Sequence, residues 1–278
     1  MYYTRSGPSH DYTSCKAEIL SALSDDCVSW HPEEGARLLP EPGELRVVCP
    51  EVVLTADGRF RMYYESQPAA AADGTLPPAV IRSAISDDGL NFVNEGVDCL
   101  ADPEQLVSFG SPRCVYLDDG SARLYSRASD GSGDVNKQVG TTMSIVCAVG
   151  DGLSFTMEGT CISQETAVES VTVYAPAVCK FRVGDGWGWR MYYAGWGGPP
   201  TRGYICSATS SDGVSWEKDP SPVLAPDSAW DGVKCSEPDI VELDGGGFRL
   251  FYEACDGTAE GETGVWRILG ASSRRAAL

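Results

Sequence analysis

Two short sequence patterns recur together along the chain, and they constrain its fold more than any other feature. The first is a strand motif of the Arg-Met-Tyr-Tyr type, whose aligned aromatic residues recur every 59 to 67 residues, at Tyr2, Tyr63, Tyr125, Tyr192 and Phe251. The second, typified by SATSSDGVSW at 207–216, places an Asp-Gly turn after a β-rich run. Repeats of this length, with four short strands each, are typical of propeller blades. Five copies therefore predict an all-β fold, a single five-bladed β-propeller.

The second repeat serves as the template for one blade. Its sequence predicts four strands, A to D, which we place at 46–55, 59–65, 80–86 and 90–96. No window shows sustained helical periodicity, so we expect little helix beyond one turn near 102–106. On this template the chain is one domain, 1–278, whose predicted blades span 1–40, 41–100, 101–163, 164–226 and 227–278.

The two ends of the chain are out of phase with the repeat. The first blade begins at strand B and lacks its inner strand, whereas the last blade ends after strand C and lacks its outer strand. One terminus of a propeller commonly completes the blade that the other terminus begins. We therefore expect either that the natural chain starts upstream of Met1 or that the ring closes incompletely. Open blade edges would then favour self-association.

Charge and cysteine content limit the classes of partner. A net charge of -19 argues against nucleic acid and anionic membranes and leaves neutral glycans compatible. The eleven cysteines include no C-x-x-C pair, and neither a signal peptide nor an apolar run of 18 residues is present. We expect a cytoplasmic protein without disulfides, cofactor or metal. His10 beside Asp11 is expected to be a surface residue rather than a metal ligand.

The motifs together resemble the arabinanase/levansucrase/invertase superfamily, the five-bladed propellers of glycoside hydrolase families 32, 43, 62, 68 and 130. The resemblance rests on the Asp-Gly turns, the Tyr-Tyr strands and four Pro-bearing inner strands, which read CPEVV, SPRCV, APAVC and EPDIV. It implies that an oligosaccharide or glycoside binds in an axial funnel, with glycoside hydrolysis or phosphorolysis as the chemistry. We expect the Asp-Gly turns to be structural: the Asp caps the turn, the Gly takes a positive φ, and the following Trp or Phe packs between blades.

In such propellers the starts of strands A and the ends of strands B face the funnel. Glycoside hydrolysis needs two carboxylates. The resemblance implies a base Asp from strand A of the first blade, a helper Asp from a middle blade and an acid Glu from a later blade. Here the first strand A is absent, Ser111 stands where the resemblance implies an Asp, and only SEPD at 236–239 resembles the signature of the acid, displaced by one residue. The predicted catalytic residues are Glu237, Glu51 and Asp239, with Glu237 or Glu51 as the acid. Alternatively, Glu237 pairs with Arg113 or Arg46.

The remaining candidates would bind substrate, and they are Arg113, Arg127, Trp196, Glu65, Glu253 and Tyr174. Glu65, Arg127 and Glu253 occupy the same position at the end of strand B, where they either bind sugar hydroxyls or pair with one another. Trp196 either stacks on a sugar or covers the core. The predicted function is that of a glycoside hydrolase-like protein acting on or binding a neutral glycan. The alternative is a non-catalytic propeller, a degenerate or N-terminally truncated relative that binds a glycan or a protein.

Overall fold

The computed structural model describes residues 1–7, 14–130, 142–183, 186–243, 247–257 and 264–272. His10 and Asp11 lie outside the described residues. Almost every described element is a strand, and the single exception in this part of the chain is the 3-10 turn η1 (Ala167–Glu169). The prediction of an all-β fold is confirmed. None of the described helices could cross a membrane.

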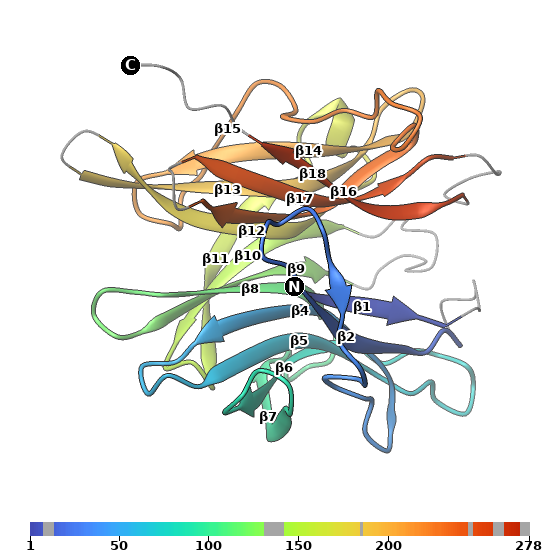
Figure 1. The fold of residues 1–278 in the computed structure, drawn as a ribbon, viewed down its shortest axis with the longest axis vertical. Coiled ribbons are helices and arrows are strands. Elements are labelled where there is room, and N and C mark those ends of the chain that lie inside the picture. The colour runs from blue at the N-terminus through green and yellow to red at the C-terminus, as the bar shows by residue number, and fades with distance from the viewer. Residues whose placement is uncertain (8–13, 131–141, 184–185, 244–246, 258–263, 273–278) are drawn as a thin grey trace. The chain divides into compact units, whose positions relative to one another are not determined.

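The strands form antiparallel groups that follow one another in chain order (Figure 1). The first sheet contains β1 (Tyr2–Ser6), β2 (Ala17–Leu23) and β3 (His31–Pro32). The second contains β4 (Glu44–Leu54), β5 (Phe60–Pro68), β6 (Val80–Ser86) and β7 (Val93–Leu100). The third contains β8 (Ser108–Tyr116), β9 (Ala122–Ser129), β10 (Met143–Gly150) and β11 (Phe155–Ser163).

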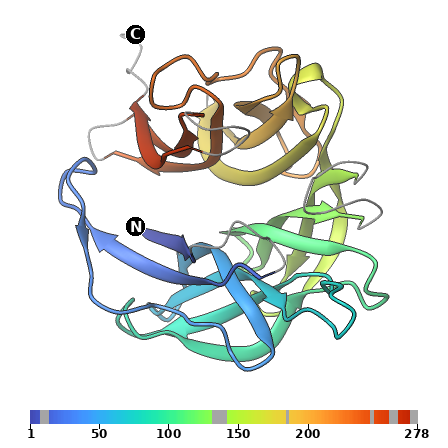
Figure 2. The same cartoon turned by 90° about the vertical axis from the view of Figure 1, so that its right-hand side faces the viewer.

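The remaining strands belong to one seven-stranded sheet, whose members run side by side in Figure 2 in yellow to red. Its first part contains β12 (Thr172–Val183), β13 (Gly186–Gly197), β14 (Arg202–Ser210) and β15 (Glu217–Lys218). Its second part contains β16 (Lys234–Glu242), β17 (Phe248–Cys255) and β18 (Trp266–Ser272). A parallel pairing of Gly203 with Lys234 joins β14 to β16, and the other neighbours pair antiparallel. As the sequence predicts, the described strands give the first group no inner strand and the last group no outer strand.

The chain forms two compact units. Unit 1 contains residues 1–142 and 146–158, and unit 2 contains residues 143–145 and 159–278. The single domain with five numbered blades stays a prediction.

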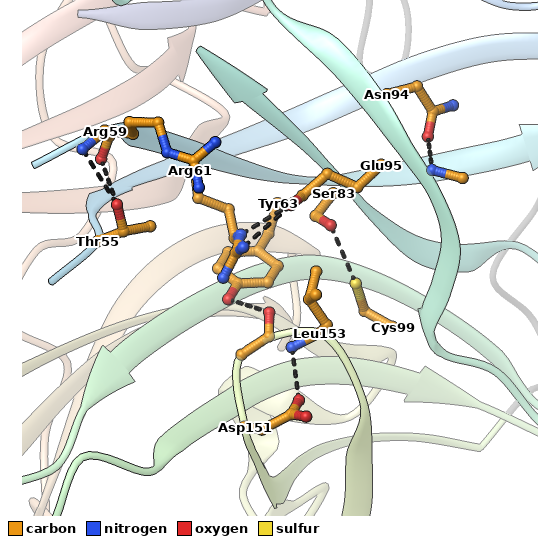
Figure 3. Close-up of polar contacts among 12 residues, drawn as sticks. Thr55, Arg59, Arg61, Tyr63, Ser83, Asn94, Glu95, Cys99, Asp151 and Leu153 are labelled. Atoms are coloured by element: carbon orange, nitrogen blue, oxygen red, sulfur yellow. Dashed lines mark hydrogen bonds and ion pairs between the residues drawn. The ribbon is translucent and has the colours of Figure 1, made fainter. Parts of the chain in front are cut away.

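In unit 1 the recurring motifs join neighbouring sheets. The Tyr63 hydroxyl donates a hydrogen bond of 2.6 Å to the carbonyl of Gly152, in the Asp-Gly turn of the next sheet (Figure 3). The Tyr63 ring also packs edge-on against Phe155 of that turn, with ring centroids 6.0 Å apart. Tyr2 repeats both contacts one sheet earlier, with the carbonyl of Gly89 at 2.9 Å and the ring of Phe92 at 5.7 Å. The tyrosine of one repeat and the Asp-Gly turn of the next therefore connect neighbouring sheets.

The Asp-Gly turns have the predicted local chemistry. In each turn one carboxylate oxygen accepts hydrogen bonds from the backbone N–H groups two and three residues ahead. Asp151, for example, accepts from Leu153 (Figure 3) and from Ser154. These bonds lower the pKa of the Asp151 carboxyl. Gly89, Gly152 and Gly213 take positive φ values of 73°, 97° and 75°. The capping and φ predictions are confirmed.

One local prediction is wrong. Residues 102–106 form a turn instead of a helical turn, because the Asp102 carboxylate accepts hydrogen bonds from the backbone of Leu106 and Val107. The helical turn lies instead at η1, where the Glu169 side chain accepts a bond from the backbone of Thr166.

Candidate functional site

All four inner strands carry the same irregularity at an X-Pro dipeptide. The residue before each proline has a positive φ: 55° at Cys49, 47° at Ser111, 51° at Ala175 and 46° at Glu237. The ladder register shifts at each of these places, as expected for a β-bulge. A positive φ at a residue other than glycine costs about 1–3 kcal/mol, so the surrounding structure holds these bulges in place. Bulges redirect the side chains beside them, here those of the predicted site residues.

The ladder register also aligns the ends of the second strands. Glu65, Arg127, Ala194 and Glu253 each lie opposite the residue that precedes a bulge. Glu65, Arg127 and Glu253 therefore share one position, as the sequence predicts. At the same position β13 carries Ala194, whose methyl side chain can form neither an ion pair nor a hydrogen bond.

In unit 1 this position holds a buried ion pair. Arg127 Nη2 lies 3.3 Å from Glu65 Oε2, and the two side chains are 14% and 6% exposed. The same carboxylate oxygen accepts the backbone N–H of the bulge residue Ser111. Gly110 makes room for the pair, since a Cβ there would lie 2.0 Å from Glu65 Oε2. The sequence left open whether these residues bind sugar hydroxyls or pair with one another, and in the structure Glu65 pairs with Arg127.

A second ion pair lies one residue beyond the bulges of unit 1. Arg113 Nη1 is 2.6 Å from Glu51 Oε2, and both side chains are less than a fifth exposed. We call Glu51, Glu65, Arg113 and Arg127 the paired cluster. Each carboxylate in it faces a guanidinium, so its chemistry is that of a neutralised, mostly buried network.

In unit 2 the equivalent residues are arranged differently. The Ser236 hydroxyl donates a 3.0 Å hydrogen bond to Glu253 Oε2 across the β16–β17 ladder. Glu237 follows Ser236 directly, on the bulge, and is half-buried, whereas Asp239 is exposed just beyond Pro238. No described cation lies within ion-pair distance of Glu253. Two carboxylates, those of Glu237 and Asp239, thus lie on β16, and a third, that of Glu253, lies on the paired strand β17.

Beside these carboxylates the ammonium of Lys234 lies among three aromatic rings. Its Nζ is 5.7 Å from the ring centroid of Tyr174, 5.5 Å from that of Trp196 and 5.0 Å from that of Trp266. The lysine is 8% exposed, Trp196 is half-buried and Trp266 is 40% exposed. We call these four residues the aromatic cluster.

The ladder explains why the cluster forms. Trp196 pairs with Gly203, Gly203 with Lys234, Lys234 with Cys255, and Cys255 with Trp266. Paired residues project from the same face of a sheet, so Trp196, Lys234 and Trp266 share one row. Gly203 leaves the space between Trp196 and Lys234 open, because a Cβ there would meet Lys234 Cγ at 2.5 Å. The row therefore brings two indoles and one ammonium together from strands far apart in sequence.

The turn before β16 is fixed by Asp231, which is 4% exposed. Its carboxylate accepts hydrogen bonds from the Tyr252 hydroxyl at 3.1 Å, from the Cys235 thiol at 3.6 Å and from Ser228. Burial raises the pKa of this carboxyl, but these hydrogen bonds lower it more, and its pKa lies below the ordinary value. A structural role explains Asp231 fully, since all its partners hold the chain leading into β16.

The predicted site residues thus fall into two groups. Glu51, Glu65, Arg113 and Arg127 lie in unit 1, and Tyr174, Trp196, Glu237, Asp239 and Glu253 lie in unit 2. Sequence reasoning missed Lys234 and Trp266, as well as Gly203, which admits them. The signal that could have found Lys234 was its place four residues before Pro238, where the inner strand starts. Among the described residues no group of three or more His, Cys, Asp and Glu side chains could hold a metal ion.

Comparison with solved structures defines the fold. The chain is similar to a glycoside hydrolase with a TM-score of 0.73 and 15% identity, over 99% of this chain and 84% of that one. It is similar to a thermostable family-43 glycoside hydrolase, with a TM-score of 0.68 and 17% identity over 99% and 91% of the two chains. It is also similar to a β-1,2-mannobiose phosphorylase from Listeria innocua, in complex with β-1,2-mannobiose. The TM-score is 0.65 and the identity 15%, over 94% of this chain and 67% of that one.

The chain therefore has the β-propeller fold of these carbohydrate-active proteins, as the sequence predicts. At these identities the likeness concerns the fold alone. No model of a known protein family matches the sequence, and no curated protein matches it. The number of blades in the ring stays a prediction.

Proposed function

We propose that this chain is a glycoside hydrolase-like propeller that binds a glycan on the aromatic cluster of unit 2 and cleaves it with the neighbouring carboxylates. The observation that carries the proposal is the row formed by Trp196, Lys234 and Trp266, with Glu237 and Glu253 beside it. Sugar rings present apolar faces and hydroxyl groups. Partly exposed indoles suit the first, and carboxylates suit the second.

The carboxylates divide the chemical work. In this proposal Glu237 is the general acid that protonates the leaving oxygen, as the sequence signature suggested. Glu253, oriented by the Ser236 hydroxyl at 3.0 Å, is the base or nucleophile. Asp239 binds a sugar hydroxyl at the exposed end of the bulge. Glu51, the other predicted acid, is ion-paired with Arg113, which favours a structural part for it.

A second candidate function is glycan binding without catalysis. Its support comes from the paired cluster, where Glu51 and Glu65 each face an arginine. An acid or base in a glycosidase must exchange protons with substrate and water, and a carboxylate held by a guanidinium is poorly placed to do so. The two candidates share the glycan and differ in the reaction.

Hydrolysis of a panel of nitrophenyl glycosides distinguishes them. We expect the wild type to cleave at least one member and Glu237→Gln to lower that rate by about 10²-fold or more, because positioned acid–base groups contribute 10²–10⁴-fold. Glu253→Gln should have a comparable effect. Glu242→Gln is the matched control, since Glu242 lies exposed at the far end of β16.

Each outcome of this panel has a consequence. Equal rates for wild type and Glu237→Gln would remove Glu237 from the mechanism. A wild type that binds polysaccharides in affinity electrophoresis but cleaves none of the glycosides would favour the second candidate. A protein that neither binds nor cleaves any carbohydrate would contradict both. Self-association through the sheet edges and a cytoplasmic location stay predictions, which sedimentation and cell fractionation would test.

A further inference from the structure

We propose that Trp230 is a second stacking platform for the glycan, so that the ligand of unit 2 is a chain of several sugars rather than one terminal sugar. This inference rests on the proposed function and adds the class of ligand. Trp230 is 57% exposed and lies in the turn before β16, four residues from the start of that strand. An indole face that is open to water suits the apolar face of a sugar ring.

The backbone of Trp230 is fixed by the turn in which it lies. Its N–H donates a hydrogen bond of 3.1 Å to the Ser228 hydroxyl. The buried Asp231 carboxylate accepts hydrogen bonds from the backbone N–H groups of Asp227 and Ser228 and from the Ser228 hydroxyl. The same carboxylate accepts the Tyr252 hydroxyl of β17 at 3.1 Å. The ring is therefore carried by a turn that is anchored to the sheet.

The ring of Trp230 is held as well. The guanidinium carbon of Arg267 lies 4.9 Å from its centroid, over one face of the indole. Arg267 Nη1 is in turn 2.9 Å from Asp256 Oδ2, and the Asp256 side chain is only 5% exposed. Cation–π attraction holds the indole against this ion pair, and its 57% exposure leaves the opposite face to the solvent. A ligand that stacks there does not have to order a mobile side chain.

Trp230 lies at the same end of the sheet as the aromatic cluster, but on the other side of β18. Trp266 and Arg267 are consecutive residues of β18, and consecutive side chains of a strand point to opposite faces. Trp266 belongs to the aromatic cluster, whereas Arg267 contacts Trp230. The two exposed indoles therefore flank the first residues of β18. A glycan chain that crosses this end of the strand would stack on both.

The surroundings of Trp230 favour a neutral glycan as the occupant. The ion pair of Arg267 and Asp256 lies against its ring, and Asp227 and Ser228 in its own turn supply further polar groups. Protein partners bind on contiguous apolar patches, whereas a sugar needs one ring face with hydrogen-bonding groups beside it. The net charge of -19 favours a neutral chain over an acidic one.

The test compares each polysaccharide with the disaccharide of the same sugar. The probes are linear arabinan, xylan and β-mannan, measured by affinity electrophoresis of the full chain, and their disaccharides, measured by calorimetry. The readout is the ratio of the affinity for the polymer to the affinity for the disaccharide. We expect Trp230→Ala to lower this ratio by about tenfold for the polymer that the wild type binds best, because only a long ligand reaches Trp230. Trp266→Ala should lower both affinities together.

Two further variants and one measurement on the wild type assign the effect to this ring. Trp230→Phe keeps a ring face and should recover part of the ratio. Trp187→Ala is the matched control, because Trp187 is also 57% exposed but lies at the other end of β13, two residues before Trp189, whose ring centroid is 5.1 Å from Lys180 Nζ. In the wild type, bound polymer should protect Trp230 and Trp266 from oxidation and leave Trp187 reactive, as read by mass spectrometry. Thermal unfolding checks that each variant is folded.

Several results would overturn the inference. If Trp230→Ala keeps the wild-type ratio, Trp230 contacts no sugar, although glycan binding on the aromatic cluster stands. If the polymer protects Trp266 and leaves Trp230 reactive, the glycan does not cross β18, and this footprint decides alone if Trp230→Ala does not fold. An equal fall of the ratio in Trp187→Ala would mean that exposed indoles bind the polymer without a defined site. If no probe binds to the wild type, both the inference and the proposed function fail.

Discussion

The inner strands of unit 1 and unit 2 share a backbone device and differ in the side chains that surround it. Both have X-Pro bulges with a positive φ, at Cys49 and Ser111 in unit 1 and at Ala175 and Glu237 in unit 2. In unit 1 the carboxylates beside the bulges face arginines at 2.6 and 3.3 Å. In unit 2 the equivalent Glu253 accepts a serine hydroxyl, and a lysine stands among three rings.

This difference indicates how one repeat can serve two purposes. Each inner strand has its bulge at the same place in the ladder, and the bulge orients the neighbouring side chains whatever their chemical type. Where glutamate and arginine meet, the pair becomes a buried, self-satisfied part of the structure. In unit 2 the equivalent position carries Ala194 on β13 and Glu253 on β17, and Glu253 accepts the hydroxyl of Ser236. The comparison therefore predicts that changes in the paired cluster affect stability alone, whereas changes in the aromatic cluster also affect binding.

The largest expected effect is on the paired cluster. Arg127→Met leaves Glu65, whose side chain is 6% exposed, without its cation. Breaking a buried pair in this way costs about 3–5 kcal/mol of unfolding free energy, measured by urea denaturation. The double variant Glu65→Met/Arg127→Met should recover most of the loss, because no uncompensated charge remains. A single-variant loss below about 1 kcal/mol would show that the pair is solvated.

Unit 2 has its own buried ion pair, which lies at η1. Glu169 is 1% exposed and accepts hydrogen bonds from Lys218 at 2.8 Å and Tyr193 at 2.6 Å. Burial raises the pKa of this carboxyl, but Lys218 and Tyr193 lower it more, and it lies below the ordinary value. The pair therefore stabilises the fold above the ordinary glutamate pKa, and this contribution is lost as pH falls below it.

Lys218→Met should consequently cost about 1.5–3 kcal/mol at neutral pH, the value of a hydrogen bond to a charged group. It should also move the acid-unfolding midpoint to higher pH, since the Glu169 carboxyl then protonates more readily. Circular dichroism across a pH titration checks both, with Lys180→Met as control. An unchanged midpoint would mean that Glu169 does not govern acid unfolding.

Two glycines sharpen the comparison. Alanine at Gly110 would meet Glu65 Oε2 at 2.0 Å, and alanine at Gly203 would meet Lys234 Cγ at 2.5 Å. Each substitution should cost about 1–3 kcal/mol of stability from overpacking. Only Gly203→Ala should weaken polysaccharide binding, because only Gly203 borders the aromatic cluster. Equal loss of binding in both variants would contradict the separation of roles.

The smallest expected effect on stability is at Glu253. Glu253→Gln keeps the size of the side chain and can still accept the Ser236 hydroxyl, so its cost should be about 0.5–1 kcal/mol. Glu65→Gln at the equivalent position should cost clearly more, because Arg127 then loses its anion. Urea denaturation of the two variants side by side tests this. Equal losses would erase the distinction between the units.

The parts of the structure that local chemistry controls could be predicted from the sequence. The Asp151-Gly152 turn follows from one carboxylate and one glycine, and the strands from β-rich runs between such turns. The positive φ at Ser111 and Glu237 could not be predicted, because residues other than glycine avoid that region unless the sheet imposes it.

Lys234 was missed for a related reason. Its ring partners lie on β12, β13 and β18, at sequence distances of 60, 38 and 32 residues from it (234 − 174, 234 − 196 and 266 − 234). Only the ladder register across six strands brings them together, through pairings that include Gly203. Patterning within a strand predicts which face a residue occupies, but not which distant residues share its row.

The most direct test of the central claim is the affinity of Trp196→Ala for the polysaccharide that the wild type binds best. Trp196 occupies the aromatic cluster, and removing a buried aromatic anchor from a binding site costs about 2 kcal/mol or more, close to a 30-fold loss of affinity. The comparison variant is Arg113→Met in the paired cluster, which should bind as the wild type does. Loss of affinity confined to Trp196→Ala would establish the site on unit 2. Unchanged affinity in Trp196→Ala, or loss in Arg113→Met alone, would contradict it.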